Sequence, residues 1–409
     1  MTNSKQQRSP LAPMRFPQLP QIAGARFASA AAGVRYHDRA DVALATLQPG
    51  TVIAGVFTRS STRAACVIDC QNKIGEDATN GAAILVNAGN ANAFTGRAGV
   101  QSVARLCTTL AAKTDIPSQR IFTSSTGVIG ELLPTASIEA SLSDLVERQS
   151  PDQLADMAQA ILTTDTFAKG AARRVEIDGR VVQLAGIAKG SGMIAPNMAT
   201  MLAYVFTDAD LEQSQLQAMV KRQNHRSFNC ITVDGDTSTS DTLLVCATRA
   251  SNVRVDGHEI FEEALGSLML DLAQQIVRDG EGATKFITIE ISGADTDADA
   301  RVHAHAIANS PLVKTAISGE DPNWGRVVMA IGKSGAQADR DLLRIWFGNV
   351  LVAEDGWVSA NYSEKDARRH LRQAEVSIKV DFGLGLGKTT VWTCDFSKRY
   401  IEINADYRS

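Results

Sequence analysis

The pair Ala199-Thr200 stands at the end of a glycine-rich polar segment and directly before a strand-like run. The segment reads KGSGMIAPNMAT over Lys189–Thr200, and the apolar run that follows covers Met201–Phe206. A small residue, a threonine and then a strand is the order that a self-cleaving amino-terminal nucleophile requires. In a strained turn the Thr200 hydroxyl could attack the preceding carbonyl. Hydrolysis of the resulting ester would then make Thr200 a new chain start.

A freed α-amine would give Thr200 a second chemical role. The reference pKa of an α-amine is about 7.7–8.0, so the amine can act as a base for its own hydroxyl near neutral pH. One residue then supplies both the nucleophile and the base, and no histidine is needed. Taken alone, the pattern is weak evidence, because most threonines before a strand are ordinary buried side chains.

Three other patterns suggest chemistry but fail on their details. The run GLGLGKTT over Gly383–Thr390 is similar to a phosphate-binding loop, yet Phe382 stands where that pattern needs glycine, and a strand-like run follows where a helix should begin. We therefore expect a turn between two strands. His303 and His305 lie two apart, so both could face one side if this segment were a strand, but no third ligand is nearby. This favours an exposed strand face over a metal site. A GxSxG serine hydrolase pattern does not occur.

The cleavage segment KGSGMIAPNMATML resembles the cleavage motif of the ornithine acetyltransferase family, also called glutamate N-acetyltransferases. Further blocks match the family's pattern in the same order along nearly the whole chain, which makes the resemblance specific. These blocks are Ala54–Thr58, Ala83–Gly96, Ser124–Pro134, Leu162–Lys169, Cys230–Thr242, Arg278–Ile287, Glu320–Gly335 and Ile403–Ser409.

The resemblance implies a ping-pong acetyl transfer in arginine biosynthesis. The Thr200 hydroxyl would take the acetyl group from N2-acetyl-L-ornithine, release ornithine and pass the acetyl group to L-glutamate. Acetyl-CoA would be a further donor if the enzyme also catalyses the first acetylation step. The resemblance implies no metal and no bound organic cofactor.

The resemblance also assigns residues that would act on the acetyl group. Thr126 and Gly127, in the STGVIG loop, would stabilise the tetrahedral oxyanion, and losing one such donor costs about 3–4 kcal/mol of barrier. Thr163 matches a position that contacts substrate. Thr164, one residue further, could instead be the one that points inward.

The remaining assigned residues would hold the two amino-acid substrates. Lys189 would bind a substrate carboxylate or lower the pKa of the Thr200 ammonium group. Glu281 would receive the cationic end of ornithine. Asn404 and Ser409 also match substrate-binding positions, which would fold the C-terminal tail into the pocket.

Strand-like and helix-like runs alternate along the chain, which predicts an α/β protein with layered packing. The expected strands are Thr51–Phe57, Ala83–Asn87, Val181–Ile187, Met201–Phe206, Leu243–Ala247, Phe286–Ile291, Leu343–Val352, Val376–Val380 and Thr390–Thr393. The expected helices are Gly99–Lys113, Ile138–Arg148, Asp152–Leu162, Asp210–Arg222, Glu259–Arg278 and Glu364–Gln373. The resemblance narrows the fold to an α-β-β-α sandwich like that of amino-terminal-nucleophile enzymes, with a second, smaller α/β lobe in the C-terminal half.

Cleavage before Thr200 would divide the chain into two polypeptides. The resemblance implies an α chain, Met1–Ala199, and a β chain, Thr200–Ser409, assembled as α2β2. The assigned site residues come from both chains. We therefore expect the two products to remain associated as one folded unit.

The composition limits the classes of function. With 41 basic and 45 acidic residues the net charge is −4, which excludes a strongly basic nucleic-acid binder and gives no sign of a membrane-surface role. Apolar runs are shorter than the roughly eighteen residues of a membrane span, and Met1–Arg15 lacks the apolar stretch of a signal peptide. The six cysteines show no CxxC spacing and are typical of buried thiols in a reducing cytosol. A cytoplasmic protein is expected.

Two other functions stay open from the sequence. A related amidase or aminopeptidase would use the same self-cleaved nucleophile but release the acyl group to water. It would not need Lys189, Glu281, Asn404 and Ser409 to hold two amino acids. A non-catalytic binding protein for arginine-pathway amino acids would remain uncleaved and bind ornithine without turnover.

Overall fold

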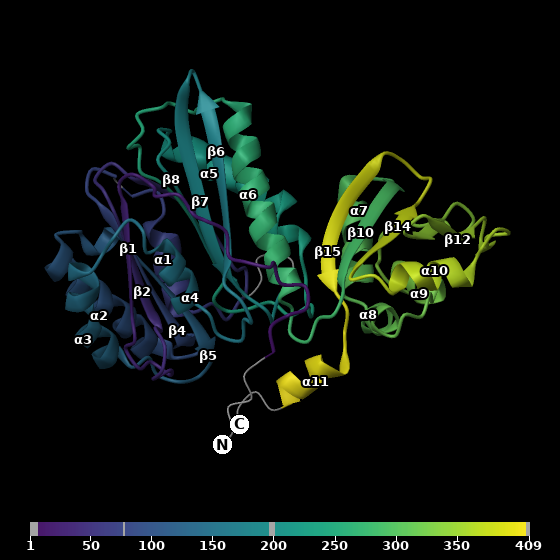
Figure 1. Ribbon diagram of the computed structural model, residues 1–409, viewed down its shortest axis with the longest axis horizontal. Coiled ribbons are helices and arrows are strands. Elements are labelled where there is room, and N and C mark those ends of the chain that lie inside the picture. The colour runs from purple at the N-terminus through teal and green to yellow at the C-terminus, as the bar shows by residue number, and fades with distance from the viewer. Residues whose placement is uncertain (1–6, 77, 196–200, 406–409) are drawn as a thin grey trace. The chain divides into compact units, whose positions relative to one another are not determined.

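The chain divides into two compact units, each with its own hydrophobic core (Figure 1). The computed structural model describes residues 7–76, 78–195 and 201–405. The larger unit comprises Met14–Asn229 and Asp236–Ile276. The smaller unit comprises Met1–Pro13, Cys230–Gly235 and Val277–Ser409. Each unit is described by itself below.

Two sheets form the middle of the larger unit. The first has the order β1-β2-β4-β5 and consists of β1 (Ala25–Ala30), β2 (Val42–Leu47), β4 (Ala82–Asn90) and β5 (Ile121–Val128). The second has the order β3-β9-β8-β7-β6 and consists of β3 (Val52–Phe57), β9 (Thr242–Ala247), β8 (Leu202–Thr207), β7 (Arg180–Lys189) and β6 (Lys169–Ile177). One core cluster contains Phe27 and Phe122 of the first sheet together with Tyr204 and Phe206 of the second. The two sheets therefore pack face to face.

Helices cover the outer face of each sheet. On the first sheet these are α1 (Ala65–Lys73), α2 (Gly96–Thr114) and α3 (Thr135–Glu147), and a second core cluster joins them to the strands. On the second sheet they are α5 (Gln213–Arg226) and α6 (Glu259–Arg278), while the short α4 (Leu154–Ala160) joins the core between the sheets. Gly186 of β7 lets α6 approach, because a Cβ there would lie 2.8 Å from a Leu268 methyl carbon. The expected α-β-β-α sandwich is confirmed.

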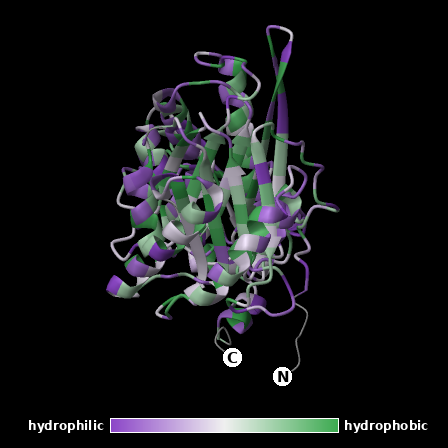
Figure 2. Ribbon diagram, turned by 90° about the vertical axis from the view of Figure 1, so that its left-hand side faces the viewer, coloured by the Kyte–Doolittle hydropathy of each residue, from purple (hydrophilic) through white to green (hydrophobic). Residues whose placement is uncertain are grey.

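Strand β8 lies in the middle of its sheet, and its residues are of the types that suit a buried central strand. All six residues are buried and five are apolar, as expected for a strand covered on both faces. It runs antiparallel to β7, with Leu202 opposite Lys189, and parallel to β9. In Figure 2 the strands in the middle of the view are mostly hydrophobic, and the surrounding helices and loops carry most of the hydrophilic residues.

The smaller unit contains one mixed sheet with helices packed on it. The strand order is β13-β12-β11-β14-β10-β15, formed by β13 (Trp357–Val358), β12 (Val350–Glu354), β11 (Arg344–Phe347), β14 (Glu375–Asp381), β10 (Phe286–Ala294) and β15 (Gly387–Cys394). The helices are α7 (Asp297–Ala308), α8 (Pro311–Ser318), α9 (Trp324–Gly332), α10 (Glu364–Leu371) and α11 (Lys398–Ala405). Alternating residues of β10 and β14 point into the core with one face of α7. This unit is the expected smaller lobe.

Three local expectations are settled in the smaller unit. The GLGLGKTT run turns the chain after β14, and its last four residues, Gly387–Thr390, begin β15, so the expected turn between strands is confirmed. The single strand expected over Leu343–Val352 is wrong, because Gly348 at φ +62° turns the chain between β11 and β12. The exposed strand face favoured for His303 and His305 is also wrong. Both lie in α7, where His303 is buried, stacks on Phe382 at 4.1 Å and contacts the Gln337 carbonyl at 3.0 Å.

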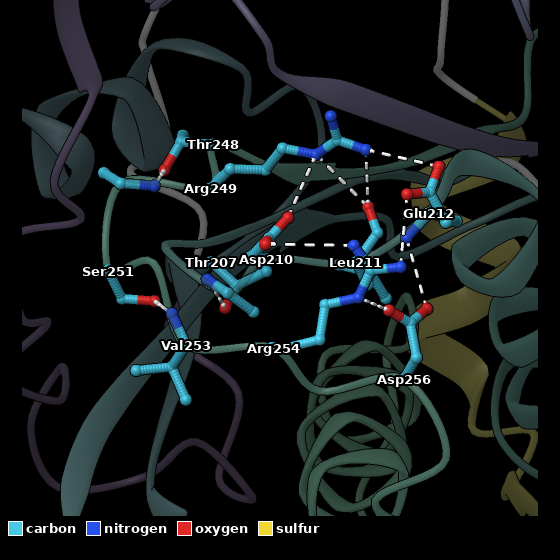
Figure 3. Close-up of polar contacts among 12 residues, drawn as sticks. Thr207, Asp210, Leu211, Glu212, Thr248, Arg249, Ser251, Val253, Arg254 and Asp256 are labelled. Atoms are coloured by element: carbon cyan, nitrogen blue, oxygen red, sulfur yellow. Dashed lines mark hydrogen bonds and ion pairs between the residues drawn. The ribbon is translucent and has the colours of Figure 1, made fainter.

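A network of ion pairs ties the segment before α5 to the segment before α6 (Figure 3). Arg249 Nε lies 3.3 Å from Asp210 Oδ1, and Arg254 Nη2 lies 3.1 Å from Glu212 Oε1. Arg254 also pairs with Asp256, which accepts the Glu212 backbone N–H at 3.2 Å. These side chains are partly exposed, so each pair contributes little to stability.

Two further findings bear on the expectations from composition. Each of the six cysteines is buried and carries a free thiol. Within the described residues, the structure has no helix with the length and apolar character that crossing a membrane requires.

Candidate active site

Lys189 is the centre of a buried polar cluster in the larger unit. It is the last residue of β7 and is 3% exposed. Its ammonium group donates to Thr163 Oγ1 at 2.7 Å and to Thr126 Oγ1 at 3.1 Å. Three residues that lie far apart in the sequence are therefore joined by one charge-assisted pair of hydrogen bonds. Each of the three belongs to the predicted site.

The two neighbouring threonines have different partners. Thr163 accepts the Lys189 ammonium, whereas Thr164 Oγ1 lies 2.7 Å from Ser191 Oγ, beyond the end of β7. Of the two threonines, Thr163 is the one that contacts Lys189. Thr164 joins the polar segment that leads from β7 toward Thr200, and Thr163 joins the ammonium group.

Asp165 carries a buried carboxylate within the same cluster and is not among the site residues predicted from the sequence. Its Oδ1 accepts Lys169 Nζ at 2.7 Å and the Gly190 backbone N–H at 2.6 Å. Its Oδ2 accepts the Thr163 backbone N–H at 3.1 Å and lies 3.9 Å from Lys189 Nζ. Burial alone would raise the pKa of Asp165, but the two ammonium groups and the Gly190 backbone N–H outweigh it and hold that pKa below its ordinary value.

Gly127 occupies a position at the end of β5 that only glycine fits. Its φ is +135°, and a Cβ there would lie 2.2 Å from the Gly89 carbonyl carbon and 2.5 Å from Asn90 N. The parallel pairing of β4 with β5 shifts register at Asn90, where the two chains approach. The STGVIG segment, expected as a loop, is therefore mostly strand, and Thr126 is held by the sheet rather than by a free turn.

Asparagines of the NAGNAN block fix the chain next to Gly127. Asn87 Nδ2 donates to the Asn90 carbonyl at 2.8 Å, and Ser125 Oγ donates to Asn87 Oδ1 at 2.7 Å. Asn90 Nδ2 donates to the carbonyls of Glu131 and Leu132 at 3.2 Å each. Buried amide side chains thus fasten both sides of the proposed oxyanion segment. The sequence signals for this role are their position in a glycine-rich block and the resemblance of that block, Ala83–Gly96, to the family's pattern.

The strand that follows Thr200 enters the sheet beside Lys189. Thr200 and Ala199 lie outside the described residues. Met201 is buried, and its backbone N–H donates to Asp241 Oδ1 at 3.1 Å. Asp241 is fully buried, and its Oδ2 has no hydrogen-bond partner among the residues that the structure describes. Burial raises the pKa of Asp241 well above its ordinary value, although the Met201 N–H and the Lys189 charge oppose the shift.

Glu281 and Asn404, predicted separately from the sequence, lie together in the smaller unit. Asn404 Nδ2 donates to Glu281 Oε2 at 2.9 Å and to the Tyr400 carbonyl at 3.0 Å. Glu281 is 6% exposed, whereas Asn404 stands on the surface of α11. Gly282 lets α11 pack here, because a Cβ would lie 2.5 Å from Tyr400 N. Ser409 lies outside the described residues.

The site residues thus form two groups. Thr126, Gly127, Thr163 and Lys189 belong to the larger unit, and Glu281 and Asn404 belong to the smaller one. The first group offers a buried ammonium, two hydroxyls and a glycine backbone at a strand end. Such a set of donors can stabilise a developing negative charge on oxygen. The second group offers a carboxylate that can bind a cation.

Known proteins of similar sequence show the family to which this chain belongs. A model described as the ArgJ family matches residues 26–409. The chain is 65% identical over 401 residues to the arginine biosynthesis bifunctional protein ArgJ of Ruegeria pomeroyi, covering 98% of each chain. It is 51% identical to the protein of the same name from Gluconobacter oxydans, covering 98% of this chain and 95% of that protein.

Solved structures of similar proteins cover about half of the chain. A crystal structure of arginine biosynthesis bifunctional protein ArgJ from Bacillus halodurans is 40% identical, with a TM-score of 0.48 over 50% of this chain and 98% of that one. Ornithine acetyltransferase from Mycobacterium tuberculosis, complexed with ornithine, is 31% identical, with a TM-score of 0.38 over 43% of this chain and 92% of that one.

Proposed function

The chain belongs to the ArgJ family, and we propose that it is a self-cleaving acetyltransferase of arginine biosynthesis. It would move the acetyl group of N2-acetyl-L-ornithine to L-glutamate through an acetyl ester on Thr200. The observation that carries this proposal is the buried Lys189 ammonium, which contacts Thr126 and Thr163 and lies on the strand paired with the one that follows Thr200. The relatives named above are called arginine biosynthesis proteins, which supports the pathway.

The proposed reaction begins with attack of the Thr200 hydroxyl on the acetamide carbonyl, while the α-amine of Thr200 takes the hydroxyl proton. Thr126 Oγ1 accepts from Lys189, so its own hydrogen can be donated to the oxyanion that forms. The Gly127 N–H would be the second donor. The ammonium formed at Thr200 then gives its proton to the leaving ornithine amine. Glutamate reverses these steps with its own amine and carries the acetyl group away.

Further parts of the proposal concern the substrates and the assembly. Glu281, with Asn404 as its hydrogen-bond partner, would bind the ammonium end of ornithine. Ser409 would contribute from the C-terminal tail. We propose Met1–Ala199 and Thr200–Ser409 as the two chains, assembled as α2β2 in the cytoplasm, where six buried free thiols would stay reduced.

Acetyl-CoA is proposed as a second acetyl donor. The word bifunctional in the names of the relatives supports this. Apart from this co-substrate, the proposed reaction needs no cofactor, because the nucleophile, the base and the oxyanion donors all come from the chain.

The first test is the intact mass of the purified protein under denaturing conditions. Two products of 199 and 210 residues (409 − 199 = 210), the second beginning at Thr200, are expected. Thr200→Ala should give one uncleaved chain, and Thr200→Ser should still cleave. A single full-length species from the natural sequence would contradict the proposal and favour a binding protein.

The second test follows the acetyl group. The cleaved enzyme is incubated with N2-acetyl-L-ornithine carrying a labelled acetyl group, with and without L-glutamate. We expect the label in N-acetylglutamate and little free acetate. Label released mainly to water would identify an amidase instead. The same assay with labelled acetyl-CoA tests the second donor.

A further inference from the structure

We propose that Asp165 is a positioning residue for acetyl transfer, which fixes the Lys189 ammonium between the hydroxyls of Thr126 and Thr163. This inference rests on the proposed function. The side chain of Asp165 is fully buried and contacts both the segment that carries Thr163 and the end of the strand that carries Lys189. Asp165 would act through Lys189 and would not itself contact the substrate.

The carboxylate of Asp165 ties together two separate segments of the chain. Through Oδ2 it accepts the backbone N–H of Thr163, two residues before it in the sequence. Through Oδ1 it accepts the backbone N–H of Gly190, directly after Lys189. The two backbone segments that present the Thr163 hydroxyl and the Lys189 ammonium are therefore held by one group. A shift of either segment would change the 2.7 Å contact between them.

Lys189 needs such a group because its side chain has no fixed shape. A lysine carries a compact charge on a flexible four-carbon stem and loses about 2 kcal/mol of rotamer entropy when it is ordered. The hydroxyls of Thr126 and Thr163 give it direction but no opposite charge. The Asp165 carboxylate, 3.9 Å away, supplies that charge and favours one place for the ammonium group.

Lys169 holds Asp165 in turn. The Lys169 side chain is fully buried and lies four residues after Asp165. Its ammonium donates to Asp165 Oδ1 at 2.7 Å and to the Phe167 carbonyl at 3.2 Å, and it lies 4.7 Å from the centre of the Phe167 ring. The carboxylate is thus anchored on one side by Lys169 and by two backbone N–H groups. Its remaining interaction is directed at Lys189.

The decisive experiment is a double-mutant cycle between Asp165→Asn and Lys189→Met in the cleaved enzyme. Asparagine keeps the size of the side chain but removes its charge. We expect Asp165→Asn to lower kcat/KM for acetyl transfer at least about tenfold. In the Lys189→Met background, where there is no ammonium to position, the same change should alter kcat/KM by less than about twofold.

Asp208→Asn is the matched control. Asp208 is also buried and contacts β7, where its Oδ1 accepts the Gln183 backbone N–H at 2.9 Å, outside the site. We expect this variant to stay within about twofold of the natural enzyme. The positioning role is overturned if Asp165→Asn leaves kcat/KM unchanged. It is also overturned if Asp165→Asn lowers kcat/KM by the same factor with and without the Lys189 ammonium.

A structural readout covers two further cases, in which Asp165→Asn does not fold or the natural enzyme shows no transfer. Asp165→Glu keeps the charge but moves it by one methylene, and its crystal structure should show Lys189 Nζ displaced by about 1 Å or more from Thr163 Oγ1. An unchanged contact would refute the inference. Absence of transfer by the natural enzyme would refute the proposed function instead, and the displacement would still decide the role of Asp165.

Discussion

Replacing Gly127 by alanine should both disable acetyl transfer and destabilise the fold, by comparable free energies. The φ of +135° is strained for any residue with a Cβ, which costs about 1–3 kcal/mol. The new Cβ would also lie 2.2 Å from the Gly89 carbonyl carbon and 2.5 Å from Asn90 N. Both are backbone atoms of β4 and cannot rotate away. The two strand ends must therefore separate by roughly 1 Å to reach ordinary contact distance.

That separation would move the donors of the proposed oxyanion site. Oxyanion donors act only within about 2.7–3.1 Å of the charge, and losing one lowers kcat by about 10²–10³. For Gly127→Ala we therefore expect a loss of kcat in that range. The loss of unfolding free energy should be about 2–4 kcal/mol, combining backbone strain with partial loss of strand pairing.

Gly130→Ala separates the two effects. Gly130 lies three residues further along the same segment at φ +87°, and a Cβ there would meet nothing within 4 Å. It should lose about 1–2 kcal/mol of stability from strain alone and keep kcat within about threefold. Urea unfolding and initial rates of acetyl transfer measure both quantities. Natural kcat in Gly127→Ala would refute the assignment of this strand end to the oxyanion site, and equal losses in both variants would refute the steric argument.

Three further predictions concern the charged groups. Lys189→Met should lower kcat by about 10²-fold with less effect on unfolding, and full activity measured by the same transfer assay would contradict a role for its ammonium. Asp241→Asn, made in the uncleaved Thr200→Ala chain, should become progressively more stable than Thr200→Ala itself as the pH rises above about 4. Folding raises the pKa of the buried Asp241 carboxyl. The chain that keeps Asp241 is therefore most stable below the pKa that this carboxyl has in the unfolded state, and it loses stability as the pH rises toward the pKa of the folded state. Urea unfolding at several pH values measures this, and a difference that stays constant with pH would refute it. Arg254→Ala should cost little stability, because the ion pairs drawn in Figure 3 are partly exposed, and the cost should shrink with added salt. A large loss that salt does not reduce would show that the network is more than a surface feature.

The elements with strong periodicity were predictable from the sequence. Helix α6 has the predicted bounds, Glu259–Arg278, because its apolar residues recur on one stripe along its length. The buried strand β8 was expected within one residue of its position. Helix α7 is not predictable in the same way, because three of its five buried residues are alanines and alanine gives little contrast with polar neighbours.

Some residues of the candidate site were predictable from the sequence and others were not. Thr126, Thr163 and Lys189 came from a resemblance, and their contacts confirm that they lie together. Asp165 has a local sequence signal only in Lys169, four residues later, a spacing that usually indicates a surface pair. Its contact with Gly190 depends on how β7 is placed in the sheet, and no local pattern encodes that. Asp241 likewise meets Met201 only because β8 and β9 are parallel neighbours.

The proposed cut does not follow the division into compact units, and this explains how its products could stay together. It would fall within the larger unit, between the paired strands β7 and β8. The second sheet would then contain β3, β6 and β7 from one chain and β8 and β9 from the other, in the order β3-β9-β8-β7-β6. Two seams of backbone hydrogen bonds, between β3 and β9 and between β7 and β8, would join the products. Separating them would expose Tyr204 and Phe206, which are fully buried between the sheets, so the chains could part only when the whole unit unfolds.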